Sequence, residues 1–207
     1  MKIATVGLDL AKTLFQVHGV DLQGHVIVRK QLRRVDVLPF FAKLGPCVVG
    51  MQACGSSPYW GRELTKPGHS VCLIAPQFVR PYVKSNKTDA ADAEAICEAV
   101  NRPHMRFVPI KTQAQQTMLS LHRARAGLVK SRTALASQIR GLLSEFGIVL
   151  PQGIRLLGQR AIEALSNREP ELCEPFRALI QMLVEHLREL GNKAAELEGR
   201  IRAMHRT

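Results

Sequence analysis

Residues 2–10 read KIATVGLDL, a run of apolar and β-branched side chains that predicts a buried strand. Residues 13–20 alternate between apolar and polar types, which is typical of a second strand. Residues 21–24 have the composition of a turn, and residues 25–34 then begin as a third strand. The chain therefore opens with a three-stranded antiparallel meander.

Strands and helices alternate after this meander. The apolar runs at 47–52 and 70–75 predict two further strands. Helices are expected over 35–44, from Ser57 to near Pro67, over 76–83 and over 88–101. Three antiparallel strands followed by α/β crossovers indicate a mixed α/β sheet of ribonuclease-H-like topology. We assign this domain to residues 1–101.

The rest of the chain is expected to form long helices. Residues 112–146 contain no proline and place leucines on one stripe, which predicts a long amphipathic helix. Residues 176–204 carry apolar side chains at heptad spacing, typical of a coiled coil or helical hairpin. This segment either pairs with a second copy or folds back on 112–146. We divide this region into a basic helical arm (102–157) and a coiled-coil segment (158–207).

Charge indicates the class of partner. The 207 residues carry a net charge of +12, and residues 101–160 hold ten basic side chains against one acid, Glu145. This excess favours nucleic acid over a merely solvated helix face. The candidate contacts are Arg80, Lys84, Lys87, Arg123, Arg125, Lys130, Arg132 and Arg140. Arg80, Lys84 and Lys87 are equally explained by neutralisation of nearby acids.

Composition also argues against membrane-spanning, disulfide-stabilised and zinc-knuckle proteins. No apolar run is long enough to span a membrane. The five cysteines are an odd number without C-x2-C spacing, which argues against a disulfide framework or a zinc knuckle and favours a reducing cytosol.

Acidic residues suggest a site at one edge of the sheet. Asp9 lies within an apolar strand, where a carboxylate needs a partner or a cation. Asp89 and Asp92 share one face of a helix, where the helix dipole alone would also favour them. In a ribonuclease-H-like fold the first strand, the end of the fourth strand and the last helix converge, so Asp9, residue 52 and the aspartate pair would meet. Such a site suits Mg²⁺ and phosphodiester cleavage.

Several motifs resemble the DEDD-type insertion-sequence transposases, recombinases that use a structured guide RNA. They are Gly7-Leu8-Asp9-Leu10-Ala11-Lys12, Cys54-Gly55-Ser56-Ser57-Pro58-Tyr59-Trp60, the segment from Leu73 to Lys84, the segment from Lys87 to Ile96, Arg102 to Pro109 and Gln138 to Gly147. The resemblance covers residues 2–157. It implies a resolvase-like (RuvC-type) domain holding Mg²⁺ through four acids, a helical region that dimerises and grips RNA and DNA, and a C-terminal domain with a serine nucleophile.

The sequence departs from this family pattern in two places. The fourth acid should be a glutamate, but the motif here reads Met51-Gln52-Ala53-Cys54. Gln52 offers an amide oxygen without the charge, so the expected catalytic set is Asp9, Asp89, Asp92 and Gln52, with the three aspartates as metal ligands. Glu94 and Glu98 lie on the wrong side of the helix to replace the glutamate, whereas Glu63 stays open as a substitute. No serine matches the nucleophile motif, and we interpret the chain as the N-terminal part of a truncated transposase.

Three functions follow as hypotheses. The first is a DNA transposase fragment that binds Mg²⁺, DNA and a structured guide RNA. The alternatives are a decayed remnant that only binds DNA or RNA, and a resolvase-type metal nuclease; Gln52 and the missing serine domain leave the enzymatic status open. A homo-oligomer through residues 176–204 is expected, with no membrane association and a bacterial cytoplasmic, nucleoid-associated location.

Overall fold

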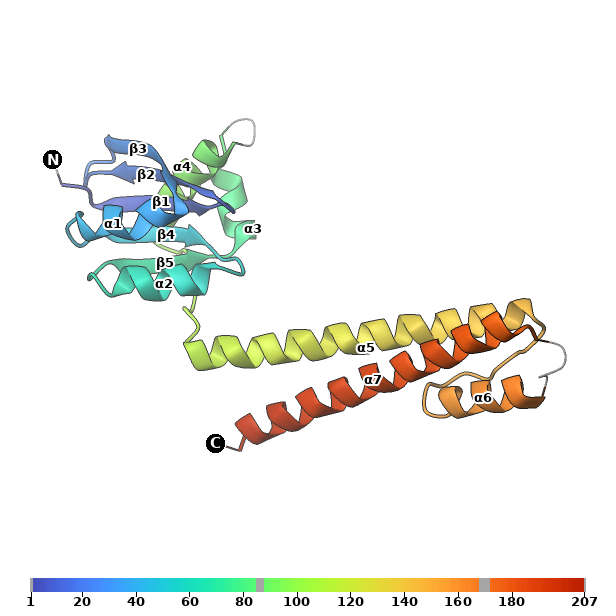
Figure 1. Cartoon of the computed structure of the whole chain (residues 1–207). Helices are drawn as coiled ribbons and strands as arrows, with labels where there is room; N and C mark the ends of the chain where they lie inside the picture. The colour runs from blue at the N-terminus through green and yellow to red at the C-terminus, as the bar shows by residue number, and fades with distance from the viewer. Residues whose placement is uncertain (1, 85–87, 168–171, 207) are drawn as a thin grey trace. The chain divides into compact units, whose positions relative to one another are not determined.

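The computed structural model describes residues 2–84, 88–167 and 172–206, which fold into two compact units. The first unit comprises Met1–Gln113 and the second Ala114–Thr207. Figure 1 shows that the first is a sheet covered by helices and that the second consists of helices. No helix in the described ranges combines the length and the hydropathy that a membrane span requires.

The first unit is built on a six-stranded mixed sheet with the strand order β3-β2-β1-β4-β5-β6. The first three strands form an antiparallel meander, β4 and β5 run parallel to β1, and β6 pairs antiparallel with β5. The strands are β1 (Thr5–Leu10), β2 (Leu14–Val20), β3 (Val26–Arg33), β4 (Val48–Gln52), β5 (Ser70–Ile74) and β6 (Phe107–Val108). The expected ribonuclease-H-like mixed sheet is confirmed.

Helices cover both faces of this sheet. They are η1 (Arg34–Asp36), α1 (Val37–Ala42), α2 (Ser57–Thr65), α3 (Pro76–Val79), η2 (Arg80–Tyr82) and α4 (Asp89–Val100). On one face Phe41 of α1 and Trp60 and Leu64 of α2 pack against Leu8 and Met51 of the central strands. These side chains are almost completely buried, so this face carries the larger apolar core.

The other face is covered by α4, which approaches the sheet unusually closely. A Cβ at Gly7 would lie 2.1 Å from the carbonyl oxygen of Ala93 and 2.5 Å from the amide nitrogen of Cys97. At Gly50 of β4, a Cβ would lie 3.0 Å from Val100. Gly7 therefore lets the backbone of α4 rest directly on β1, and Gly50 makes room for the side chains of Val100 and Ile96 over β4.

One strand of the sheet is not predicted by the sequence. β6 consists of Phe107 and Val108, which pair with Ile74 and Leu73. Two residues are too few for an alternating pattern to be recognised, and Pro109 follows immediately.

The second unit consists of α5 (Gln113–Glu145), α6 (Leu157–Asn167) and α7 (Glu174–Met204). Figure 1 shows α5 and α7 side by side and antiparallel. Toward one end the rings of Phe146 and Phe176 stack with centroids 3.9 Å apart, and farther along Arg125 of α5 forms an ion pair with Glu198 of α7. The predicted helix over 112–146 and the helix over 176–204 correspond to α5 and α7, whereas α6 was not expected.

The apolar stripe of α7 is buried within the chain. One core joins all three helices: Ile139 and Leu143 come from α5, Ala161 from α6, and Ile180 and Leu187 from α7. Each of these side chains is at most 5% exposed. Of the two arrangements left open by the heptad pattern, the structure therefore adopts the one in which residues 176–204 fold back on 112–146.

A buried histidine makes the stability of the first unit depend on pH. His18 of β2 is 5% exposed, and burial lowers its pKa below the ordinary 6.5, although Glu94 opposes this effect. The unfolded chain therefore binds the proton more readily than the folded chain. The contribution of neutral His18 to stability is fully present above about pH 7 and is lost as the pH falls below the ordinary histidine pKa. We expect the free energy of unfolding of the first unit, measured by urea denaturation, to decrease from about pH 7.5 to 5.5. His18→Gln should reduce this slope, whereas substitution of the exposed His104 should not; equal slopes would contradict the prediction.

Candidate metal centre

Asp9 lies at the carboxyl end of β1, on the face covered by α4. Side chains alternate along a strand, so Asp9 points to the same face as Gly7, two residues earlier. Since α4 rests directly on Gly7, its first turn comes close to the end of β1. Asp9 is half-buried, although it belongs to a strand whose preceding residues are buried.

The first turn of α4 supplies the other two carboxylates. Thr88 caps this helix, and its side-chain oxygen accepts a hydrogen bond of 3.2 Å from the Ala91 amide. Asp89 and Asp92 follow in the first turn; Asp89 is exposed and Asp92 half-buried. A carboxylate oxygen from each of Asp9, Asp89 and Asp92 lies within 4.8 Å of the others. The fold thus gathers the three expected acids at one edge of the sheet.

Gln52 ends β4 beside this group. The parallel register pairs Gly7 with Gly50 and Leu8 with Met51, so Asp9 and Gln52 are the next residues along the two strands. Gln52 also lines a cavity of about 730 Å³, together with Asp92 and Arg80. Gln77, which was not among the predicted site residues, lines the same cavity. Its place just after β5, at the carboxyl edge of the sheet, is the signal that could have identified it.

The donor set fits a hard divalent cation. Three carboxylates with like charge repel one another at this separation, and a cation between them would remove the repulsion. Carboxylate oxygens are the protein ligands that Mg²⁺ and Ca²⁺ prefer, and Mg²⁺ commonly takes only a few of them. The group also borders an open cavity, which leaves room for a substrate oxygen or water.

The other acids considered for this site are paired with basic side chains. Glu94 forms ion pairs with Arg29 and Lys84, at 3.6 and 3.5 Å, and Glu98 pairs with Lys84 at 3.0 Å. The bond from Lys84 holds the pKa of Glu98 below its usual range, and the same contact raises the pKa of Lys84. On α2, Glu63 lies 2.7 Å from Lys66. The structure therefore gives each of these glutamates a basic partner.

The basic residues expected to contact nucleic acid have different surroundings. In the first unit Arg80 lines the cavity of the acidic group, and Lys84 forms ion pairs with the glutamates of α4. Lys87 lies outside the described residues. The contact with nucleic acid itself stays a prediction for all of them.

On α5 the basic residues divide into two groups. Arg123 and Lys130 are exposed to solvent. Arg125 is paired with Glu198, and Arg140 donates hydrogen bonds to the carbonyl oxygens of Pro151 and Gly153 at 3.3 and 2.5 Å. Arg140 thereby fixes the segment between α5 and α6 to the end of α5. Arg132 lines a separate cavity among the helices of the second unit.

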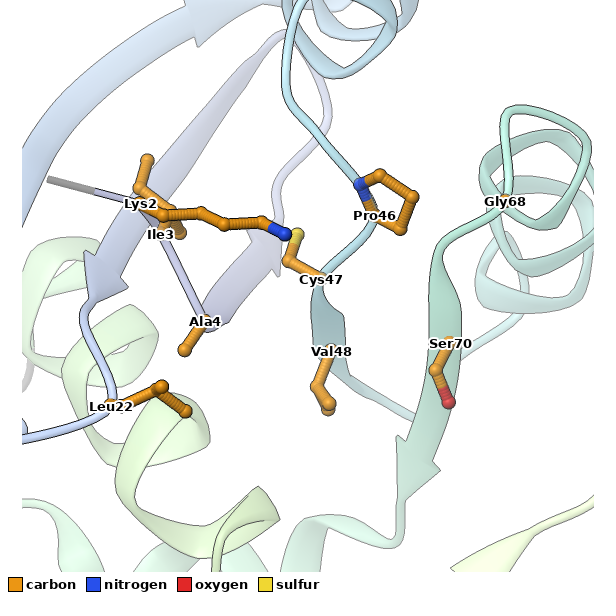
Figure 2. A pocket seen from close by; sticks show the side chains of 9 residues that line it. All are labelled: Lys2, Ile3, Ala4, Leu22, Pro46, Cys47, Val48, Gly68 and Ser70. Atoms are coloured by element: carbon orange, nitrogen blue, oxygen red, sulfur yellow. The ribbon is translucent and has the colours of Figure 1, made fainter.

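A second cavity of about 390 Å³ lies at the opposite ends of the parallel strands (Figure 2). Cys47 lines it, and its Sγ lies 3.3 Å from Nδ1 of His69. Burial raises the pKa of this thiol to about 11, so it stays protonated and is a poor nucleophile. Nε2 of His69 lies 3.1 Å from the carbonyl oxygen of Phe41, and the pair therefore joins the residue that precedes β4 to α1 and supports the fold.

A mixed sheet in this strand order, with one carboxylate at the carboxyl end of β1 and two more in the first turn of α4, defines the class of this domain as ribonuclease-H-like with an acidic site that could hold a metal. The particular family follows from the sequence profile of the IS110-type DEDD transposases, described as "Transposase", which matches residues 6–148. The chain belongs to this family.

Curated relatives agree with this assignment. The chain is 50% identical over 204 residues to a protein of Pseudomonas aeruginosa named "Probable family 20 transposase". It is 39% identical to the transposase for insertion sequence element IS1328 of Yersinia enterocolitica and 37% identical to that for IS1111A of Coxiella burnetii. These alignments cover 98, 95 and 98% of this chain but only 60, 61 and 56% of the relatives, in the same order. The chain thus spans somewhat over half the length of the proteins it matches.

Proposed function

We propose that this chain supplies the metal-binding and nucleic-acid-binding part of an insertion-sequence transposase, acting in DNA transposition. The observation that carries the proposal is the group of Asp9, Asp89 and Asp92, whose carboxylates lie within 4.8 Å of one another. Family membership supports the same reading, since transposases act on DNA.

Mg²⁺ is the cation that we propose for this group. Asp9, Asp89 and Asp92 would hold it, and Gln52 would face the same space through its amide oxygen. A bound Mg²⁺ would lower the pKa of water and stabilise charge on phosphate oxygens. Arg80 lines the adjoining cavity, where its guanidinium would orient a phosphate of the DNA backbone.

We further propose DNA element ends and a structured guide RNA as partners, bound through the exposed basic residues of α5. The charge of residues 101–160, with Glu145 as their single acid, supports this. Self-association through residues 176–204 is also proposed; because the apolar stripe is covered, it would use the exposed Leu179 and Met182. Such a protein would work in the bacterial cytoplasm at the nucleoid.

Gln52 favours a second candidate function, a remnant that binds DNA or RNA without recombining it. An amide in place of a carboxylate weakens cation binding, because affinity for Mg²⁺ depends on ligand charge. The third possibility, a resolvase-type nuclease, requires cutting by this chain alone and is disfavoured by the same residue.

A recombination assay separates these functions. The chain would be supplied with element-end DNA, guide RNA and a full-length relative as partner, with Asp9→Ala as the control. Product above the Asp9→Ala level supports the transposase. Retained binding with a steep salt dependence and no response to Mg²⁺ supports the remnant, and Mg²⁺-dependent cutting by the chain alone supports the nuclease.

Gln52→Glu should strengthen metal binding. The added carboxylate at the end of β4 would contribute a fourth charge, and we expect about tenfold tighter binding of Mn²⁺, used as a probe for Mg²⁺, in isothermal titration calorimetry. Gln77→Glu is the matched control, because it adds the same charge to another wall of the same cavity. If both variants gain equally, the effect is general electrostatic attraction and Gln52 does not occupy a ligand position.

A further inference from the structure

We propose that the helical unit contains a pocket for a phosphate group of a nucleic-acid backbone. A cavity of about 450 Å³ lies among α5, α6, α7 and the segment before α6. Three arginines line it: Arg132 from α5, Arg155 from the segment before α6, and Arg188 from α7. The proposal rests on the nucleic-acid binding proposed above but concerns a site separate from the acidic group.

Arg132 is the arginine of this cavity that most needs a ligand. Its Nε is buried and has no hydrogen-bond partner among the described residues. A buried donor without an acceptor is destabilising, and more so when it is charged, so such a group calls for a ligand, an ion or a water that satisfies it. The guanidinium presents its donors in a planar fork that matches two oxygens of a phosphate.

Two glycines within helices shape this cavity. Gly191 lies in the middle of α7, where glycine is less favourable than alanine. A Cβ there would contact Nε of Arg132 at 3.4 Å, so the glycine leaves this side of the guanidinium uncovered. A Cβ at Gly158 of α6 would lie 3.1 Å from Cγ1 of Val184, so this glycine allows α6 to approach α7. The two glycines thus leave one side of Arg132 uncovered and bring α6 close to α7.

The charges that face the cavity are all positive. None of the described residues that line it is acidic, and the remaining polar lining consists of the amides of Gln159 and Asn192. Gln159 donates a hydrogen bond to Glu163, and Arg188 pairs with Glu185, at 2.8 and 2.6 Å. Three guanidiniums around one hollow repel one another, and an anion between them would remove this repulsion.

The surroundings favour a backbone phosphate over a free anion. Arg155 and Arg188 are exposed, so they can contact a polymer that continues past the cavity. Arg155 is thus a candidate contact with nucleic acid that was not among the basic residues predicted from the sequence. A nucleic acid would therefore place one phosphate on Arg132 and neighbouring phosphates near the two exposed arginines.

The test uses fluorescence anisotropy with the full chain and fluorescein-labelled RNA and DNA duplexes of the same sequence. Arg132→Gln should weaken binding about tenfold and reduce the slope of log K against log salt by about 1. The control Arg160→Gln removes the same charge from an exposed position of α6 outside the cavity and should change affinity by no more than about twofold. Equal losses in the two variants would overturn the pocket, while leaving nucleic-acid binding intact. Absence of binding by the unmodified chain would overturn both proposals.

A second pair of variants covers the case in which Arg132→Gln disturbs folding. Asn192→Asp places a negative charge in the cavity from an exposed position of α7, whereas Gln181→Glu adds the same charge elsewhere on that helix. We expect Asn192→Asp to bind the duplexes more weakly than the unmodified chain, and Gln181→Glu to bind them as tightly as the unmodified chain. Inorganic phosphate, compared with chloride at equal ionic strength, should compete only weakly for the duplex. Strong displacement by inorganic phosphate would assign the pocket to the free anion and overturn the backbone assignment.

Discussion

Asp92→Asn should remove most of the stabilisation that Mg²⁺ gives to the first unit. A ligand that binds only the native state adds about 2.7 kcal/mol to the free energy of unfolding at 100 times its Kd. We expect the unmodified chain to gain this amount when Mg²⁺ is raised to that level. The variant keeps the size of the side chain but removes one of the three charges at the site, so its gain should be small at the same concentration.

Urea denaturation with and without Mg²⁺ measures this gain. Asp36→Asn is the matched control, because Asp36 is a surface aspartate of the same unit that pairs with Arg33. Its variant should lose a little stability under both conditions and keep the full response to Mg²⁺. A response in Asp92→Asn as large as that of the unmodified chain would show that the acidic group does not hold the ion.

Gly7→Ala should destabilise the first unit by at least about 3 kcal/mol. The added Cβ would lie 2.1 Å from the carbonyl oxygen of Ala93, and 2.5 Å from the amide nitrogen of Cys97. Both atoms belong to the backbone of α4, which cannot swing aside as a flexible side chain can. The helix must therefore move away from β1 or the unit must unfold.

The measurement is again the free energy of unfolding, with the Mn²⁺ affinity as a second readout. Gly55→Ala serves as the control, because an added Cβ there meets nothing within 4 Å. We expect the Gly7 variant to lose metal affinity as well as stability, since displacement of α4 would separate Asp92 from Asp9. If the Gly7→Ala variant were as stable as the Gly55→Ala variant, the close packing of α4 on β1 would be refuted.

The sheet and the acidic group could largely be predicted from the sequence, because both depend on local patterns. Apolar runs such as 2–10 and 47–52 specify the central strands, and the carboxyl ends of parallel strands must meet at one edge. Asp9 is conspicuous because it interrupts an apolar strand. The distance between the acids was not accessible in this way, since it depends on how closely α4 approaches Gly7, a contact between residues far apart in the chain.

The remaining features depend on tertiary contacts that carry little local signal. α6 was missed because Pro151 and Gly153, shortly before it, suggested a hinge. Leu157, Ala161 and Leu165 do repeat at helical spacing. The basic residues of α5 look alike in sequence. Only contacts with other segments distinguish them. Arg140 donates hydrogen bonds to loop carbonyl oxygens, whereas Nε of Arg132 has no hydrogen-bond partner among the described residues.

The covered stripe of α7 has a consequence for any study of how copies of this protein assemble. Substituting Ile180 or Leu187 with a polar residue would open the interior that α5, α6 and α7 share, and the helices would come apart before any contact between molecules was altered. Loss of a dimer in such a variant would report unfolding. Informative changes would instead be made at Leu179 and Met182, which already face water.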